Sequence, residues 1–141
     1  MVTVPDIVPD TPALRKNPVF LYFSDHFTRP QPFRPDIVIS IDDVYGKKMD
    51  MLDAHVSQFY EWLPWHDGQL DQVPTEPVER KKWLASYRSK SLPPEWRAVL
   101  QKRYGSDAAH IVHAEAFEIT EYGRQLDENE IRQLFPFFPA K

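Results

Sequence analysis

PDIVISIDDVYGKKMDMLDAHVSQF, residues 35–59, is the stretch on which the interpretation of this chain depends. Its β-branched apolar run at residues 37–41 predicts a buried strand, because branched side chains pack well on a pleated surface. Asp42 and Asp43 follow at the point where a helix would begin. Their carboxylates can cap free backbone N–H groups and complement the helix dipole, which predicts that both acids are helix-capping residues.

A helical pattern replaces the strand pattern after these two acids. Apolar side chains recur three or four positions apart over residues 44–63, which predicts one long helix that Pro64 ends. A strand that runs directly into a helix is typical of an α/β unit, in which ligands bind beyond the carboxyl end of the strand. Lys48 and His55 lie about two turns apart on similar sides of this helix.

The same stretch resembles the C-terminal signature of the PIG-L/LmbE-like deacetylase family. Residues 48–58 read KxxMLxxHxSQ and follow the strand and the acids. The family shows a PDvvvdI strand and then KxxALxxHxSQ on a helix. Glu115-Ala116-Phe117 is similar to the family's later aEaF segment, so the resemblance covers residues 18–122. The chain departs from the pattern at Met51, where a small residue is usual, and at Val56, where an arginine is usual.

The resemblance implies a zinc-dependent N-deacetylase that acts on N-acetylated sugar-type substrates. In such enzymes a zinc-bound water attacks the amide carbonyl and a carboxylate acts as general base. The family's metal motifs, AHPDDE and HPDH, do not occur in this sequence. The resemblance therefore covers the C-terminal portion of the domain only. It assigns no catalytic residue and no metal ligand in this chain. It implies that this chain alone binds no zinc and is inactive. It also implies that His55 and Gln58 lie near the substrate.

An alternative interpretation is a non-catalytic interaction or structural module. The predicted fold class is α/β, a partial Rossmann-like layer of two or three strands with four or five helices. An incomplete sheet leaves open edges and an uncovered apolar face, and both features favour association. We therefore expect a homo-oligomer, or a partner chain that carries the missing N-terminal half.

Proline is concentrated near the start of the chain. Seven of the 14 prolines fall in the first 35 residues, whereas the whole chain has 4 glycines. Proline restricts the backbone and removes an N–H donor, so residues 1–17 are predicted to be an extended Pro-rich segment. Residues 18–141 are predicted to form the deacetylase-like part. Their patterns predict a buried strand at residues 19–23 and a helix that is capped by Thr75 and runs to Arg88. Further helices are predicted at residues 94–104 and 108–116, and Asp127 and Glu130 predict a capping box at the start of another helix.

Bulk composition argues against several classes of partner. The net charge of -4 leaves no basic surplus to neutralise phosphates, which argues against nucleic acid. The chain has no cysteine, so it can form neither a disulfide framework nor a thiolate site. The apolar run at residues 19–23 is far too short to span a bilayer, and the first residues lack the pattern of a secretory signal. We therefore expect a cytoplasmic protein that does not enter a membrane.

Two histidine-containing candidates each have a plainer alternative. His110 and His113, followed by Glu115, could bind zinc if they lie one turn apart on a helix, but packing or surface roles are commoner and no third ligand is near. Asp25 and His26 follow a predicted strand, where sites gather, yet adjacent side chains cannot face each other.

The paired acids and the aromatic residues have similar alternatives. Asp42 and Asp43 could serve acid–base chemistry, although helix capping would explain them fully. The charged run at residues 79–82 indicates a solvated helix face. Four aromatic side chains could stack on a sugar or bind a partner, or could belong to the core: Phe59, Tyr60, Trp62 and Trp65.

Overall fold

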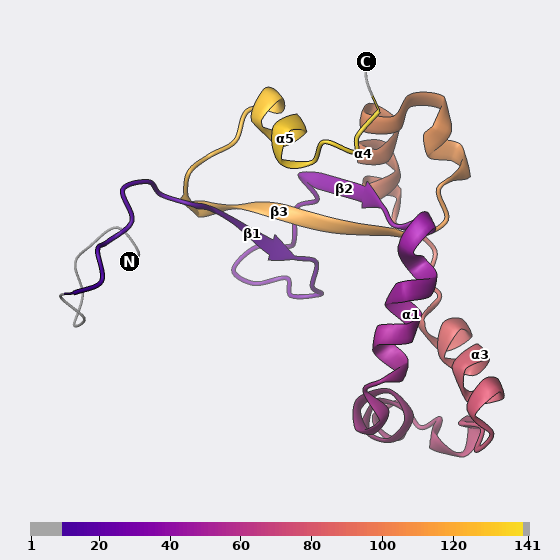
Figure 1. The fold of residues 1–141 in the computed structure, drawn as a ribbon. Coiled ribbons are helices and arrows are strands. Elements are labelled where there is room, and N and C mark those ends of the chain that lie inside the picture. The colour runs from indigo at the N-terminus through magenta and orange to yellow at the C-terminus, as the bar shows by residue number, and fades with distance from the viewer. Residues whose placement is uncertain (1–9, 140–141) are drawn as a thin grey trace. The chain divides into compact units, whose positions relative to one another are not determined.

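A computed structural model describes residues 10–139 of the chain. These residues form a mixed α/β structure with five α-helices and a three-stranded sheet (Figure 1), which confirms the predicted class and number of elements. The contacts divide them into two compact units. The sheet unit comprises residues 10–39, 94–110 and 115–139, and the helical unit comprises residues 40–93 and 111–114.

The sheet is built around the strand that comes last in the sequence. β3 (Ala114–Gly123) lies between β1 (Val19–Phe23) and β2 (Ile37–Ser40), so the strand order is β1-β3-β2. β1 and β3 are antiparallel, with Tyr22 opposite Glu118. The strand predicted around residues 37–41 is therefore confirmed, and it forms one edge of the described sheet.

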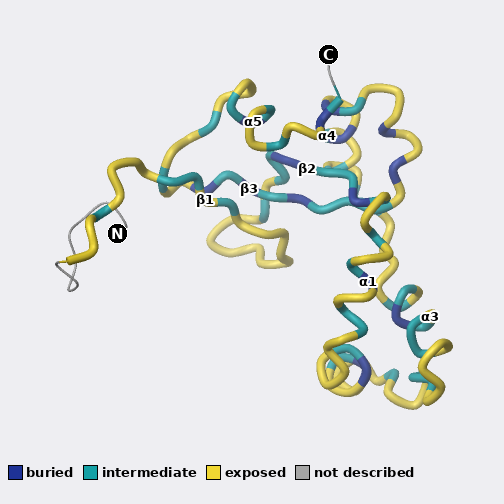
Figure 2. The backbone as a smooth tube through the Cα atoms, in the orientation of Figure 1, coloured by how far each residue is buried: buried dark blue, intermediate teal, exposed yellow. Residues whose placement is uncertain are grey.

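The core of the sheet unit lies between the sheet and the segments that follow it. Ile37 of β2 packs with Ile131 of α5 (Glu128–Leu134) and with Phe138. Ile37 and Val38 are both fully buried, as Figure 2 shows for this strand. The partly buried apolar residues that complete this core are Leu21, Ile39, Tyr104, Phe117, Ile119, Leu126 and Phe135.

The prediction of a buried strand at Val19–Phe23 is right about the strand and wrong about its burial. Phe20, Tyr22 and Phe23 are 41%, 43% and 69% exposed, and only Leu21 joins the core. β1 is an edge strand, paired on one side only among residues 10–139. An apolar run indicates that a strand can be buried, but the presence of a covering layer is decided by the tertiary structure.

The helix predicted at residues 108–116 is wrong. A 3-10 helix, Gly105–His110, covers only the first three of these residues, and residues 114–123 form β3. The segment A-E-A-F-E-I-T alternates in burial because two neighbouring strands pair with it. Strand pairing overrode the local helical preference.

The helices at both ends of the sheet unit match their predicted signals. α4 (Pro94–Tyr104) begins at its proline, as predicted. The capping box of α5 is also confirmed: the Glu130 N–H donates to Asp127 Oδ1 at 2.8 Å, and the Asp127 N–H donates to Glu130 Oε2 at 3.0 Å.

Glu128 in the first turn of α5 binds two cations of α4. Arg103 Nη1 lies 2.7 Å from Glu128 Oε2, and Lys102 Nζ lies 2.8 Å from Oε1. The hydrogen bond from Lys102 is the largest influence, and with the Arg103 charge it lowers the pKa of the Glu128 carboxyl against a smaller opposing effect of desolvation. Arg103 is buried, so Glu128 compensates a charge that has little access to water.

Glu128→Gln should lower the free energy of unfolding by about 1–2 kcal/mol at neutral pH, because the buried Arg103 loses its counter-charge. The Glu128 pKa is lowered on folding, so its stabilisation is complete above the ordinary value of 4.5 and is lost as the pH falls through the lowered value. Urea denaturation of the wild type and the variant at pH 7 and below pH 4 measures this. The exposed Glu61→Gln is the control, and an equal effect at both pH values would contradict the ion-pair explanation.

The helical unit carries the rest of the central stretch. α1 (Tyr45–Asp53) packs against α3 (Pro77–Arg88), on which Leu84 is fully buried. An ion pair between Lys81 and Asp50 also connects these two helices. The remaining elements are a 3-10 helix at Asp42–Val44, a π-helix at Ser57–Trp62, α2 (Leu63–His66) and a 3-10 helix at Leu70–Gln72.

The single helix predicted over residues 44–63 is interrupted. α1 ends at Asp53, and a π-helical segment then leads directly into α2. Pro64 does not end the helix but occupies the first turn of α2, where the missing N–H is not needed. The Tyr60 hydroxyl donates to Asp53 Oδ1 at 2.6 Å and so ties the π-helix back to α1. Burial and this bond raise the pKa of Tyr60 to about 12.

The start of α3 also differs from its prediction. Glu76, rather than Thr75, is the capping residue, because its Oε2 accepts the Val78 N–H at 2.9 Å and the Glu79 N–H at 3.1 Å. The end at Arg88 is confirmed. The charged run at residues 79–82 is not simply a solvated face, since the Arg80 guanidinium lies 4.4 Å above the Tyr60 ring.

Candidate functional site

β3 carries one carboxylate into the interior of the sheet unit. Ala116, Glu118 and Thr120 alternate along the strand and are all buried, whereas Phe117 and Ile119 belong to the apolar core. Residues two apart on a strand lie on the same face, so Glu118 shares its face with Ala116 and Thr120. Glu118 is 6% exposed. A carboxylate buried to this degree needs polar partners.

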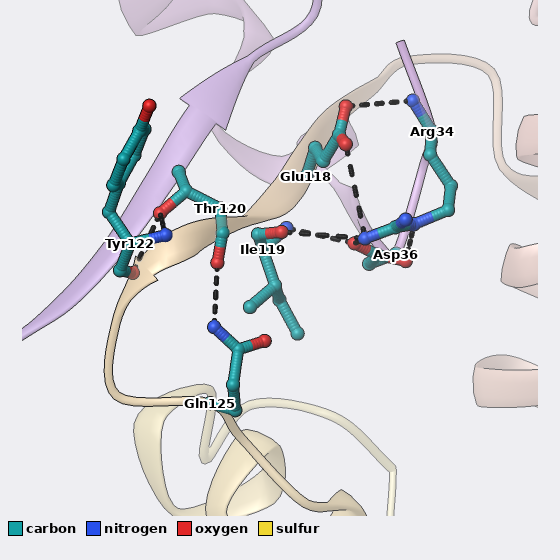
Figure 3. Close-up of polar contacts among 7 residues, drawn as sticks. All are labelled: Arg34, Asp36, Glu118, Ile119, Thr120, Tyr122 and Gln125. Carbon is teal, nitrogen blue, oxygen red and sulfur yellow. Dashed lines mark hydrogen bonds and ion pairs between the residues drawn. The ribbon is translucent and has the colours of Figure 1, made fainter. Parts of the chain in front are cut away.

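Arg34 supplies the polar partners of Glu118, and Asp36 in turn binds Arg34 (Figure 3). The Arg34 N–H donates to Glu118 Oε2 at 2.9 Å, and its Nη2 lies 3.9 Å from Oε1. The Arg34 guanidinium also donates from Nε to Asp36 Oδ1 at 2.7 Å and from Nη2 to Oδ2 at 3.0 Å. The hydrogen bond and charge of Asp36 raise the pKa of Arg34. Asp36 Oδ2 accepts the Ile119 N–H at 2.9 Å, so the network connects this segment to β3.

The far end of β3 has its own polar contacts. Thr120 Oγ1 donates to the Tyr122 carbonyl at 2.9 Å and accepts the Tyr122 N–H at 3.2 Å. Gln125 Nε2 donates to the Thr120 carbonyl at 2.8 Å (Figure 3). These bonds hold the chain where it leaves the strand.

A hollow of about 240 Å³ lies beside β1 and β3 in the sheet unit. We call it the acidic hollow, because three of its lining residues are carboxylates. Asp25 is one of them, and its Oδ1 accepts the Phe27 N–H at 3.0 Å. The residues that line the acidic hollow are Tyr22, Asp25, Phe27, Arg29, Pro30, Gln31, Phe33, Glu118 and Glu121.

Tyr22 lines the acidic hollow, and its hydroxyl has a raised pKa. Desolvation raises the pKa of the Tyr22 hydroxyl, and the charges of Glu121 and Glu118 raise it further. A second tyrosine, Tyr122, acts in the same direction. Desolvation is the largest of these influences, and the neighbouring carboxylates add to it because negative charge disfavours formation of another anion.

The helical unit contains a second polar cluster, formed by Asp42, Tyr45 and His113. His113 Nδ1 lies 2.9 Å from Asp42 Oδ1, and the His113 ring stacks on Tyr45 with 3.5 Å between centroids. Asp42 also accepts the Val112 N–H at 3.0 Å and the His113 N–H at 2.7 Å. A carboxylate bound to Nδ1 orients an imidazole and leaves Nε2 for proton exchange.

Asp42 is held as a carboxylate by these contacts. Partial desolvation opposes ionisation, but the N–H groups of Val112 and His113 and the imidazole of His113 outweigh it and lower the pKa of Asp42. The Tyr45 hydroxyl is buried and makes no hydrogen bond within residues 10–139. The predicted capping role of Asp42 is wrong, because no side-chain cap is formed at this helix start. The carboxylate binds a segment 70 residues away instead.

His55 and Gln58 both have exposed side chains at the break between α1 and the π-helix. The His55 carbonyl accepts the Gln58 N–H at 3.1 Å and the Phe59 N–H at 3.0 Å, which holds the two residues within one turn. His55 is exposed, so it is not a core histidine. Their role in substrate binding stays a prediction.

His110 and His113 do not form a pair on one helix. His110 ends a 3-10 helix, and His113 lies in extended chain before β3, where it binds Asp42. Within residues 10–139 no group of three or more histidine or acidic side chains is arranged to hold a metal ion.

The four aromatic candidates of the helical unit divide between core and surface. Tyr60 is buried and Phe59 half-buried, as expected of core residues. Trp62 and Trp65 are 54% and 67% exposed, and the Trp62 ring lies 6.3 Å from that of His66. The sugar-stacking and partner-binding alternatives thus concern the two tryptophans.

Comparison with family models, with curated proteins and with solved structures found no match. The resemblance to PIG-L/LmbE-like deacetylases consequently depends on the quoted residues alone. Among the helices of the described part, none is both long enough and apolar enough to cross a bilayer.

The sequence-based search missed Arg34, Asp36 and Glu118. A signal existed, since Glu118 stands among apolar residues in an alternating strand-like run. The acidic hollow itself has no local signature, because its lining comes from β1, from β3 and from the chain between β1 and β2.

Proposed function

We propose that this chain is the C-terminal part of a PIG-L/LmbE-like zinc-dependent N-deacetylase that acts on N-acetylated sugar-type substrates. In the assembled enzyme, this chain contacts the substrate through His55 and Gln58. Zinc and the general base come from the family's metal motifs, on a segment outside this sequence. This chain alone is therefore inactive and assembles with a polypeptide that carries the other half of a Rossmann-like layer.

One observation carries this proposal: His55 and Gln58 lie within one turn, both exposed, directly after the strand–acids–helix order that the family shows. β2, Asp42-Asp43 and α1 follow one another in that order. Imidazole and carboxamide groups donate and accept hydrogen bonds, which suits the hydroxyl and acetamide groups of an N-acetylated sugar.

The exposed outer side of β1 favours a second candidate, a non-catalytic interaction module. β1 forms an edge of the described sheet, and Tyr22 and Phe23 on it are exposed. An edge strand offers unpaired backbone groups to another chain. Sedimentation analysis at micromolar concentration tests this candidate: a dimer or larger assembly supports it, and a monodisperse monomer contradicts it.

Binding of N-acetylglucosamine tests the proposed substrate contact. His55→Ala and Gln58→Ala should each weaken binding about three- to tenfold, because each removes one polar contact worth about 0.5–1.5 kcal/mol. The binding is measured by NMR titration of the backbone amides. His110→Ala and Gln101→Ala, at exposed positions elsewhere, are the matched controls. Unchanged affinity for N-acetylglucosamine in both test variants would contradict the assignment of His55 and Gln58 to substrate binding.

The purified chain should contain no stoichiometric zinc and should release no acetate from N-acetylglucosamine. Elemental analysis and an acetate assay measure the two quantities. Co-expression with a polypeptide that carries the AHPDDE and HPDH motifs should restore both zinc and acetate release. Stoichiometric zinc in the chain alone would mean that its own histidines and carboxylates form the metal site.

A further inference from the structure

We propose that the acidic hollow of the sheet unit binds an alkylated ammonium group. The inference is independent of the proposed deacetylase function, because it concerns other residues, in the other unit. The hollow combines three aromatic side chains with three carboxylates in a volume of about 240 Å³. Each of these features points to an organic cation.

The aromatic lining supplies the first part of the argument. Tyr22, Phe27 and Phe33 line the acidic hollow. The face of an aromatic ring carries partial negative charge, and several rings around one space form the kind of cage that holds quaternary ammonium groups. An alkylated ammonium group has an apolar surface and little hydration to lose, so it suits such walls better than a strongly hydrated primary amine does.

The charge of the lining supplies the second part. The three carboxylates of the lining, Asp25, Glu118 and Glu121, outnumber the two guanidinium groups near them. One guanidinium is that of Arg29 in the lining; the other is that of Arg34, whose Nη2 lies 3.9 Å from Glu118 Oε1 and whose N–H donates to Glu118 Oε2 at 2.9 Å. An anion would be repelled by this lining, whereas a cation would be attracted.

Size and geometry narrow the class of ligand. A volume of about 240 Å³ is below the usual range of roughly 300–1,000 Å³ for pockets that enclose drug-sized molecules. A small cation or a side-chain head group therefore fits better. No group of three or more acidic or histidine side chains within residues 10–139 converges on a metal ion, so a bare metal cation is not the occupant that we infer.

Choline is the probe, and its neutral isostere 3,3-dimethyl-1-butanol is the matched ligand control. NMR titration of the backbone amides should place choline at Tyr22, Glu118 and Glu121. The neutral alcohol should bind roughly tenfold more weakly, because it lacks the charge that rings and carboxylates attract. Glu121→Gln and Phe27→Ala should each weaken choline binding about two- to fivefold. Both positions are exposed, so both variants should fold as the wild type does.

Glu95→Gln, on an exposed part of α4, is the control for the change in net charge and should leave choline affinity unchanged. Equal binding of the alcohol and choline, or shifts confined to other residues, would overturn the proposal. The alkylated ammonium group could belong to a methylated protein side chain or to a free small cation, and a parallel titration with trimethyl-lysine distinguishes the two. Tighter binding of trimethyl-lysine than of choline indicates a methylated protein side chain, and weaker binding indicates a free small cation. Amides at His55 and Gln58 should not shift with either ligand, so this test and that of the deacetylase can fail separately.

Discussion

Ile37→Ala should lower the free energy of unfolding by about 2–5 kcal/mol, because it removes buried methyl groups and leaves a cavity. Ile37 is fully buried in β2 and packs against Ile131 and Phe138. Domains of this size are stable by roughly 5–15 kcal/mol, so the loss would be a large part of the total. Urea denaturation followed by circular dichroism measures it.

Val78→Ala is the control for this experiment, because Val78 is also β-branched but is 60% exposed on α3. Its effect should stay within about 0.5 kcal/mol, as for most surface substitutions. An Ile37→Ala effect as small as the control's would mean that β2 is not the packed strand described here. A large effect would establish that the apolar run that opens the central stretch stabilises the sheet unit.

Asp42→Asn should lower the free energy of unfolding by about 1.5–3 kcal/mol, because it weakens hydrogen bonds to a charged acceptor. Asp42 accepts the N–H groups of Val112 and His113 and binds His113 Nδ1. An amide has one acceptor oxygen in place of two and presents an N–H₂ group to these donors. Urea denaturation at neutral pH measures the loss.

The pH dependence of stability follows from the lowered pKa of Asp42. A carboxylate whose pKa is lower in the folded state stabilises the protein above its ordinary pKa of 3.8. This contribution is lost as the pH falls through the lowered value. The difference in stability between the wild type and Asp42→Asn should therefore be constant above about pH 5 and shrink in more acidic solution.

Asp43→Asn is the matched control, because Asp43 is the adjacent acid, is exposed, and belongs to the same 3-10 helix. It should change the free energy of unfolding by less than about 0.5 kcal/mol. Equal losses for the two variants would show that the helix dipole, rather than the bond to residues 112–113, accounts for the effect of Asp42. The pair of variants therefore separates a local role from a long-range one.

Several elements could be predicted because their signals are local. The β-branched run predicted β2, the prolines at positions 77 and 94 predicted the starts of two helices, and Asp127 with Glu130 predicted a capping box. Each signal acts within about one turn of the residues it concerns. Backbone restriction, side-chain capping and pleated packing are short-range effects, so they operate in the same way whatever the rest of the chain does.

The candidate sites could not be predicted in the same way. Asp42 was expected to cap a helix, but its carboxylate binds N–H groups 70 and 71 residues away. Glu118 was not among the candidate residues, and its hydrogen-bond partner Arg34 is 84 residues distant. The side chains of His55 and Gln58 were identified from a motif, and their exposure became known only from the structure.

The sequence by itself determined where most strands and helices begin, because those choices depend on neighbouring residues. The tertiary structure decided which apolar strand is covered by other elements and which hydrogen-bond donor each carboxylate binds. It left β1 exposed and placed Glu118 in the interior. The physical reason is that burial and ion pairing depend on groups brought together from distant parts of the chain, and no local sequence pattern specifies these long-range contacts.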